Sequence, residues 1–182
     1  GTLIIYSSTP KIINLQLQFK EKKYYSIISI SKAHNLIFMV SRGGTYMSVI
    51  SYKNCLSSSG GQAIEIKRVS HFGSSILCLD VVGRRCILTG GSDCSIHIWS
   101  LPTMELVSRM SIQSRSVCSI SCCKEIDLIA SMDENHQVFC SSIDFQRFIN
   151  TFQVECKNGS THKILATKNG FIFISTSCPY SS

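Results

Sequence analysis

Short hydrophobic or alternating runs follow one another along the whole chain, and turn-forming residues separate them. Representative runs are Leu3–Tyr6, Tyr25–Ile30, Leu36–Val40, Tyr46–Tyr52, Ile76–Val82 and Ile96–Trp99. Many are rich in Ile, Val, Phe and Tyr, which favour strands, and no stretch shows a sustained helical periodicity. The pattern therefore predicts an all-β chain.

The predicted strands repeat at a fixed interval. The segment Ser75–Ile98 matches the segment Ser116–Cys140 at an offset of 41 to 42 residues, and a four-stranded propeller blade takes about 40 to 45 residues. A looser copy starts at Ser41, with extra length in a predicted flexible loop, Asn54–Gln62. We predict an incomplete β-propeller with three full four-stranded blades at 24–69, 70–110 and 111–152, and partial blades at 1–20 and 153–182. Because closed rings need about 4 to 8 blades, we expect the chain to be a fragment.

Four residues of the clearest copy occupy the positions that make the repeat recognisable: His71, Thr89, Asp93 and Trp99. The segment resembles the WD-repeat family, and the resemblance implies a structural role for these four residues in a buried polar network. Asp93 would then lie in the turn between the second and third strands, where its carboxylate accepts N–H groups. His71 would donate to Asp93, and Thr89 would link His71 to the Trp99 indole. Losing one member would orphan its buried partner, at a cost of roughly 1 to 3 kcal/mol.

The next copy departs from this pattern. Gln113 replaces the His, Ser131 the Thr, Asn135 the Asp and Ser141 the Trp. We expect its network to be weaker or absent.

A narrower resemblance covers His71 to Ser182. Three features carry it. An acidic-apolar-acidic segment, Glu125–Leu128, leads into a predicted strand, and a basic-aromatic-apolar segment, Arg147–Ile149, follows later. The third is Lys163–Ser175, in which Gly170 precedes an apolar strand. This pattern is similar to the last blades of the propeller that follows the BEACH domain in BEACH-family proteins. The resemblance implies an intracellular scaffold in vesicle trafficking, lysosome-related organelle biology or autophagy, with a BEACH domain upstream.

The net charge of +7 suggests a second kind of partner, nucleic acid or anionic lipid. The charges are scattered, however, and no basic stripe with interleaved aromatic residues accompanies them. The Phe-Arg-Arg-Gly motif of phosphoinositide-binding propellers is also missing, Gly83–Cys86 being the nearest approach. We therefore favour solvated loop charges, and keep a phosphoinositide- or nucleic-acid-binding propeller as an alternative.

Ten cysteines show no regular disulfide or zinc-finger spacing, so we expect buried thiols in a reducing compartment. A metal site at Cys118, Cys122 and Cys123 is a weaker interpretation, because a second Cys-x-x-Cys pair is missing. No cofactor or metal is predicted. Four isolated histidines are interpreted as strand or loop residues: His34, His97, His136 and His162. The Gly-Gly pairs at 43, 60 and 90 are interpreted as turns.

A catalytic role is not predicted. A triad of His71, Asp93 and a serine lacks any nucleophile elbow, and no phosphate-binding glycine loop is present. The sequence also has no hydrophobic stretch that approaches the roughly 20 residues of a membrane span, and no signal peptide. We predict a non-catalytic protein–protein interaction scaffold, cytoplasmic or peripheral on endomembranes, that binds other proteins through a propeller face or its loops. The alternative is a WD-repeat scaffold of another complex, such as a ubiquitin-ligase substrate receptor.

Overall fold

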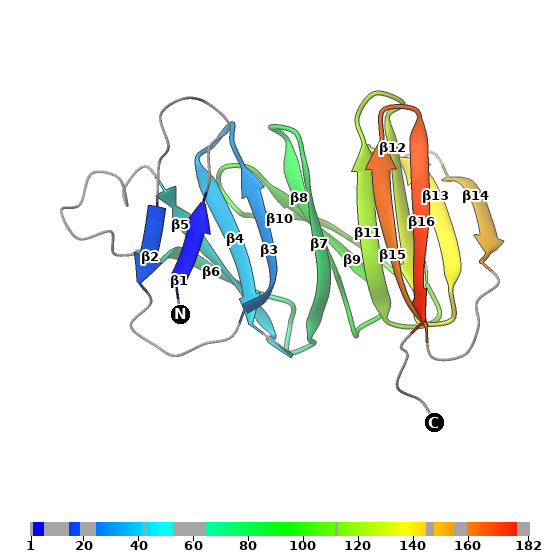
Figure 1. Ribbon diagram of the computed structural model, residues 1–182, viewed down its shortest axis with the longest axis horizontal. Helices are drawn as coiled ribbons and strands as arrows, with labels where there is room; N and C mark the ends of the chain where they lie inside the picture. Colours follow the sequence, from blue (N-terminus) through cyan, green and yellow to red (C-terminus); the bar gives the residue numbers. More distant parts are fainter. Residues whose placement is uncertain are drawn as a thin grey trace.

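The chain folds into antiparallel sheets that stand side by side in chain order (Figure 1). This computed structural model describes residues 2–5, 15–18, 25–41, 43–52, 65–111, 113–144, 148–154 and 160–177. All sixteen elements in these ranges are strands, which confirms the predicted all-β class. The described residues include no helix long and apolar enough to cross a membrane. The predicted loop at 54–62 lies outside the described residues.

Three sheets have four strands each, paired in chain order from one edge to the other. The 25–70 sheet contains β3 (Tyr25–Ser31), β4 (Leu36–Ser41), β5 (Tyr46–Ser51) and β6 (Glu65–Ser70). The 76–110 sheet contains β7 (Ile76–Val82), β8 (Cys86–Gly91), β9 (Ile96–Ser100) and β10 (Leu106–Met110). The 117–153 sheet contains β11 (Val117–Cys123), β12 (Leu128–Asp133), β13 (Gln137–Ser142) and β14 (Phe148–Gln153).

Two hairpins complete the described strands. They are β1 (Thr2–Ile5) with β2 (Leu15–Gln18), and β15 (Ser160–Thr167) with β16 (Gly170–Ser177). Within the described ranges the sheets do not close into a ring, as expected of an incomplete propeller.

The hydrophobic core lies between neighbouring sheets. Phe38 and Val40 of β4 pack with Ile76 and Trp99 of the next sheet. Every residue of β8 is buried, whereas β10 and β14, the last strands of their sheets, are mostly exposed. A central strand covered by a sheet on each side needs apolar residues on both faces, which explains the continuous hydrophobic run Leu36–Val40 of β4.

The first strands of successive sheets lie against one another, β3 against β7, β7 against β11, and β11 against β15. Side chains of β11 bond across this contact. The Ile164 and Ala166 N–H groups donate to the Ser119 and Ser121 hydroxyls, at 3.0 and 2.9 Å. These hydroxyls satisfy N–H groups of β15 that are not part of its own ladder. Small polar residues in an otherwise apolar strand thus join one sheet to the next.

Candidate functional site

Asp93 lies in the turn between β8 and β9, as the sequence predicts. The turn is formed by a left-handed residue, Cys94 at φ 59°, and by the Ser95 N–H, which donates to Asp93 Oδ1 at 3.3 Å. A short carboxylate can cap such a turn because it reaches the N–H group two residues ahead. The Asp93 side chain is 10% exposed, so its charge needs protein partners.

A row of polar side chains crosses the 76–110 sheet beside this turn. Thr89 of β8 pairs with His97 of β9, and His97 pairs with Arg109 of β10. Directly paired residues of antiparallel strands lie on the same face. The pairing therefore presents one hydroxyl, one imidazole and one guanidinium along a line that ends near Asp93.

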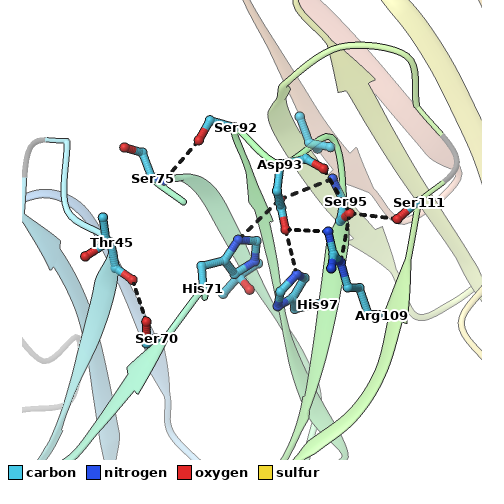
Figure 2. Close-up of polar contacts among 12 residues, drawn as sticks. Thr45, Ser70, His71, Ser75, Ser92, Asp93, Ser95, His97, Arg109 and Ser111 are labelled. Carbon is cyan, nitrogen blue, oxygen red and sulfur yellow. Dashed lines mark hydrogen bonds and ion pairs between the residues drawn. The ribbon is translucent and has the colours of Figure 1, made fainter. Parts of the chain in front are cut away.

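Asp93 gathers three basic side chains (Figure 2). His97 Nε2 lies 2.9 Å and Arg109 Nη2 3.3 Å from Asp93 Oδ2. On the other oxygen, His71 Nδ1 lies 3.4 Å from Oδ1. Arg109 Nε also donates to Ser95 Oγ at 3.1 Å, and this hydroxyl is 2.9 Å from Ser111 Oγ. The carboxylate thus connects the turn, β9, β10 and the segment before β7.

The rings of His71 and His97 stack, with centroids 3.5 Å apart and planes inclined by 22°. Gly91 makes room for this arrangement, because a Cβ there would lie 2.6 Å from His71 Nδ1 and 2.7 Å from the Ser75 carbonyl oxygen. At Gly90 a Cβ would lie 2.6 Å from Val117 Cγ1 of the next sheet. The interpretation of this glycine pair as a turn is wrong: both residues end strand β8, and close packing requires them.

Both imidazoles are fully buried. Burial first, and then the nearby His97, lower the pKa of His71 to about 4, against the opposing charge of Asp93. Burial also lowers the pKa of His97, against the hydrogen bond and charge of Asp93. Two stacked rings that share one carboxylate cannot both hold a positive charge cheaply. At neutral pH both rings are therefore neutral.

No family model and no curated protein matches the sequence. The fold does match solved structures. The chain is similar to one described as "Structure of U3-55K", with 11% identity, a TM-score of 0.65, and coverage of 81% of this chain and 45% of that one. It is equally similar to "Crystal structure of RRP9 WD40 repeats", with 10% identity, a TM-score of 0.65, and coverage of 81% and 44%.

The chain has the fold of a WD-repeat β-propeller. It spans less than half the length of these two chains, and its four-stranded sheets are propeller blades. These two structures support the resemblance to WD-repeat propellers but not the narrower one to BEACH-family propellers.

The structure brings the four predicted residues together in the 76–110 blade, but as two contacts rather than one chain. Trp99 Nε1 donates to Thr89 Oγ1 at 2.9 Å, and His71 faces Asp93. Neither ring nitrogen of His71 makes a hydrogen bond of good geometry within the described part of the chain, so no bond links His71 to the Thr89 hydroxyl. His97 occupies the place between the two pairs.

Sequence reasoning missed His97 and Arg109. The interpretation of His97 as an isolated residue is wrong, because it binds Asp93 and stacks on His71. A signal was present: His97 and Trp99 are two residues apart in an alternating strand, and such residues share a face. Arg109 carried no comparable signal, because its place depends on the register of β10.

The 117–153 blade keeps part of the pattern. Gln113 Nε2 donates to the Ser131 hydroxyl at 3.2 Å, in the place of the His and Thr. Asn135 does not supply the turn carboxylate. Asp133 does so instead, its Oδ1 accepting the N–H groups of Asn135 and Gln137 at 2.9 and 3.0 Å. This blade thus has a different network, with a neutral amide where the 76–110 blade has imidazole, and Gln113 Oε1 and Asp133 Oδ2 are buried without a hydrogen-bond partner among the described residues. Whether it is also weaker, as expected, stays a prediction.

Two sets of residues could be considered for a metal ion. The thiols of Cys118, Cys122 and Cys123 donate to three different carbonyls, those of Met132, Val81 and Thr167, and so do not converge. The ligand atoms of His71, Asp93 and His97 do lie within 4.8 Å of one another. Imidazoles that bind one ion direct their in-plane lone pairs at a common point about 2.0 Å from each nitrogen. The stacked rings of His71 and His97 do not direct their lone pairs at a common point, and the Asp93 carboxylate already forms an ion pair with Arg109. The geometry therefore fits a hydrogen-bonded cluster better than a metal site.

Proposed function

We propose that the protein is a non-catalytic scaffold that binds other proteins. The observation that carries this proposal is the propeller fold combined with a polar cluster that is committed to internal contacts. His71 and His97 are fully buried, and the Asp93 carboxylate contacts protein groups on both oxygens. The cluster stabilises one blade, and its two imidazoles are inaccessible to a substrate.

A hydrolase-like triad has no support in this geometry. Two serines flank Asp93 in the turn. The Ser95 hydroxyl bonds to the Asp93 carbonyl oxygen, Ser111 and Arg109, and the Ser92 hydroxyl accepts the Ser75 N–H, so neither bonds to an imidazole. A nucleophilic serine needs a base within hydrogen-bonding reach.

The loop between β6 and β7 is the best candidate for a partner-binding surface. Phe72 is 68% exposed and has a left-handed backbone, φ 52°, followed by Gly73 at φ 87°. A bulky residue in this conformation costs energy that the surrounding structure must offset. The Phe72 ring centroid is 5.6 Å from that of the buried His97, so the polar cluster supports an aromatic ring that otherwise faces solvent. Aromatic residues, phenylalanine among them, are enriched in protein–protein interfaces.

The test is affinity capture from cell extract with the wild-type protein and with Phe72→Ser, read by quantitative mass spectrometry. We expect Phe72→Ser to lose a defined set of protein partners while keeping its unfolding midpoint. The matched control is Phe148→Ser, because Phe148 is similarly exposed, at 61%, but lies on the outer strand β14. Equal partner sets for the three proteins, or recovery of RNA and ribosomes alone, would contradict the proposal.

A narrower proposal makes the chain part of a BEACH-type protein in vesicle trafficking, lysosome-related organelle biology or autophagy, cytoplasmic or peripheral on endomembranes. The two structural neighbours do not favour it over a WD-repeat scaffold of another complex, such as a ubiquitin-ligase substrate receptor. Reading the coding sequence upstream of Gly1 tests it, since this proposal requires a BEACH domain there.

A further inference from the structure

A cavity of about 450 Å³ lies at the other end of the blades from Phe72. It is formed by the end of β3 and its turn, by the end of β7 and its turn, and by Lys124, which follows β11. The loop of Phe72 precedes β7 and this cavity follows it. The seven residues of β7 separate the two places by about 20 Å.

Three basic residues from three successive blades line the cavity: Lys32, Arg84 and Lys124. Within the residues that the structure describes, none of the three forms an ion pair. Each occupies the turn between the first and second strands of its blade, so the repeat itself brings the charges to one place. Part of the +7 charge that is scattered in sequence is therefore concentrated in space.

One carboxylate, that of Asp80, also lines the cavity. Its Oδ1 accepts the Val81 N–H and its Oδ2 the Cys122 N–H, both at 2.8 Å. Asp80 thus holds β7 against β11, and hydrogen bonds from the backbone stabilise its charge. The three cations outnumber this single carboxylate.

Ser31 gives an independent indication of a ligand. Ser31 is one of the residues that line the same cavity, it is 2% exposed, and its hydroxyl has no hydrogen-bond partner among the described residues. A buried hydroxyl without a partner costs free energy, so such groups are uncommon and call for an explanation. An anion in the cavity would accept this hydrogen bond.

Lys124 is held in place for this role. It crosses from its own blade to the turn of the preceding one, where its Cε and Nζ would lie 3.5 and 3.9 Å from a Cβ at Gly83. Gly83 has φ 55° and no side chain, so the lysine stem packs over its backbone. An ordered side chain loses less entropy on binding than a free one.

We propose that this cavity binds a small anion carrying several phosphate groups, of the inositol polyphosphate class. A volume of about 450 Å³ suits a small ligand. Arg84 supplies a planar donor group for phosphate oxygens, Lys32 and Lys124 supply point charges, and Ser31 supplies a hydroxyl donor. A free inositol phosphate and a phosphoinositide headgroup share this chemistry.

The test is calorimetric titration of the full chain with inositol hexakisphosphate at physiological ionic strength, where diffuse surface attraction is screened. We expect saturable one-to-one binding. Arg84→Glu and Lys124→Glu should each weaken it about tenfold or more, because each removes a charged donor and adds repulsion. Lys124→Arg should retain most of the affinity.

The matched control is Arg115→Glu, which makes the same change of charge at an exposed residue before β11, whereas Lys124 follows that strand. We expect less than about a twofold effect from it. Ser31→Ala should weaken binding several-fold without lowering the unfolding midpoint, since it removes an unsatisfied hydroxyl. Equal losses in Arg84→Glu and Arg115→Glu, or no saturable binding in the wild type, would overturn the proposal.

A second arm identifies the source of the phosphates. Sedimentation with phosphatidylcholine vesicles that contain a few per cent phosphatidylinositol bisphosphate, with and without competing inositol hexakisphosphate, separates the two. Vesicle binding that the soluble compound displaces assigns a lipid headgroup. Soluble binding without vesicle binding assigns a free inositol phosphate. Vesicle binding that is unchanged in Arg84→Glu would contradict the proposal that the cavity is the phosphate-binding site.

Discussion

His71 and His97 stack their imidazole rings 3.5 Å apart beside one carboxylate, that of Asp93. The two histidines come from different parts of the blade, one from the segment before β7 and one from β9. Their contact therefore packs the segment that precedes β7 against the inner strand β9. It also makes the blade sensitive to protonation, because burial and the partner ring both disfavour a charge on His71.

We expect the free energy of unfolding to decrease as the pH falls from about 6.5 to 4. In this window the unfolded chain binds more protons than the folded one, because the pKa of His71 is lowered to about 4 in the fold. The shift corresponds to a loss on the order of 3 kcal/mol. Urea unfolding at a series of pH values measures it.

His71→Gln isolates this effect, because glutamine cannot titrate and Gln113 already occupies the equivalent place in the next blade. The variant should show a flatter pH dependence than the wild type. His34→Gln serves as the control at a partly exposed histidine outside the cluster and should keep the wild-type slope. An unchanged slope in His71→Gln would show that other groups govern the acid sensitivity.

Asp93→Ala should destabilise the fold by roughly 2 to 4 kcal/mol, since it leaves His97 Nε2 and the Ser95 N–H without their partner and removes the counter-charge of Arg109. Glu134→Ala is the control, an exposed acidic residue beside the corresponding turn of the next blade, and should change stability by less than about 0.5 kcal/mol. Equilibrium unfolding in urea compares them. A loss of partner binding in Asp93→Ala at full stability would assign the cluster a role in recognition.

Thr89→Val should lower stability by roughly 1 to 3 kcal/mol, because it removes the acceptor of the buried Trp99 indole N–H and keeps the side-chain volume. Trp99 is the single tryptophan of the chain, so its fluorescence reports this site directly. Thr89→Ser retains the hydroxyl and should fall between Thr89→Val and the wild type. A loss in Thr89→Val no larger than that in Thr89→Ser would mean that the hydrogen bond contributes little to stability.

Gly91→Ala should destabilise the protein by about 2 kcal/mol or more, since the new methyl group meets the His71 ring and the Ser75 backbone at less than 3 Å. Gly73→Ala provides the comparison. That residue has φ 87° but open space around it, so the variant loses only the conformational preference of glycine, about 1 kcal/mol. Thermal unfolding of both variants ranks them, and the reverse order would contradict the packing argument.

Most of the fold could be predicted from the sequence. The alternation of apolar residues and the 41 to 42 residue repeat predicted four strands in each of two successive segments, close to the strands β7–β10 and β11–β14 that form. The turn that holds Asp93 could also be predicted, because Ser92 and Asp93 between two apolar runs are a local turn signal. Periodicity and turn chemistry depend on neighbours in the chain, and the sequence displays those directly.

The sequence by itself determined the strands, their repeat and the presence of His71, Thr89, Asp93 and Trp99. Only the tertiary structure decided how these residues connect. Arg109 meets Asp93 because β10 pairs with β9 in one register, and His97 displaces the expected link through Thr89 because Gly91 lets His71 approach it closely. Lys32, Arg84 and Lys124 meet at one cavity because three blades stand side by side. These contacts depend on register and on packing between sheets, which join residues far apart in the chain and leave no local pattern.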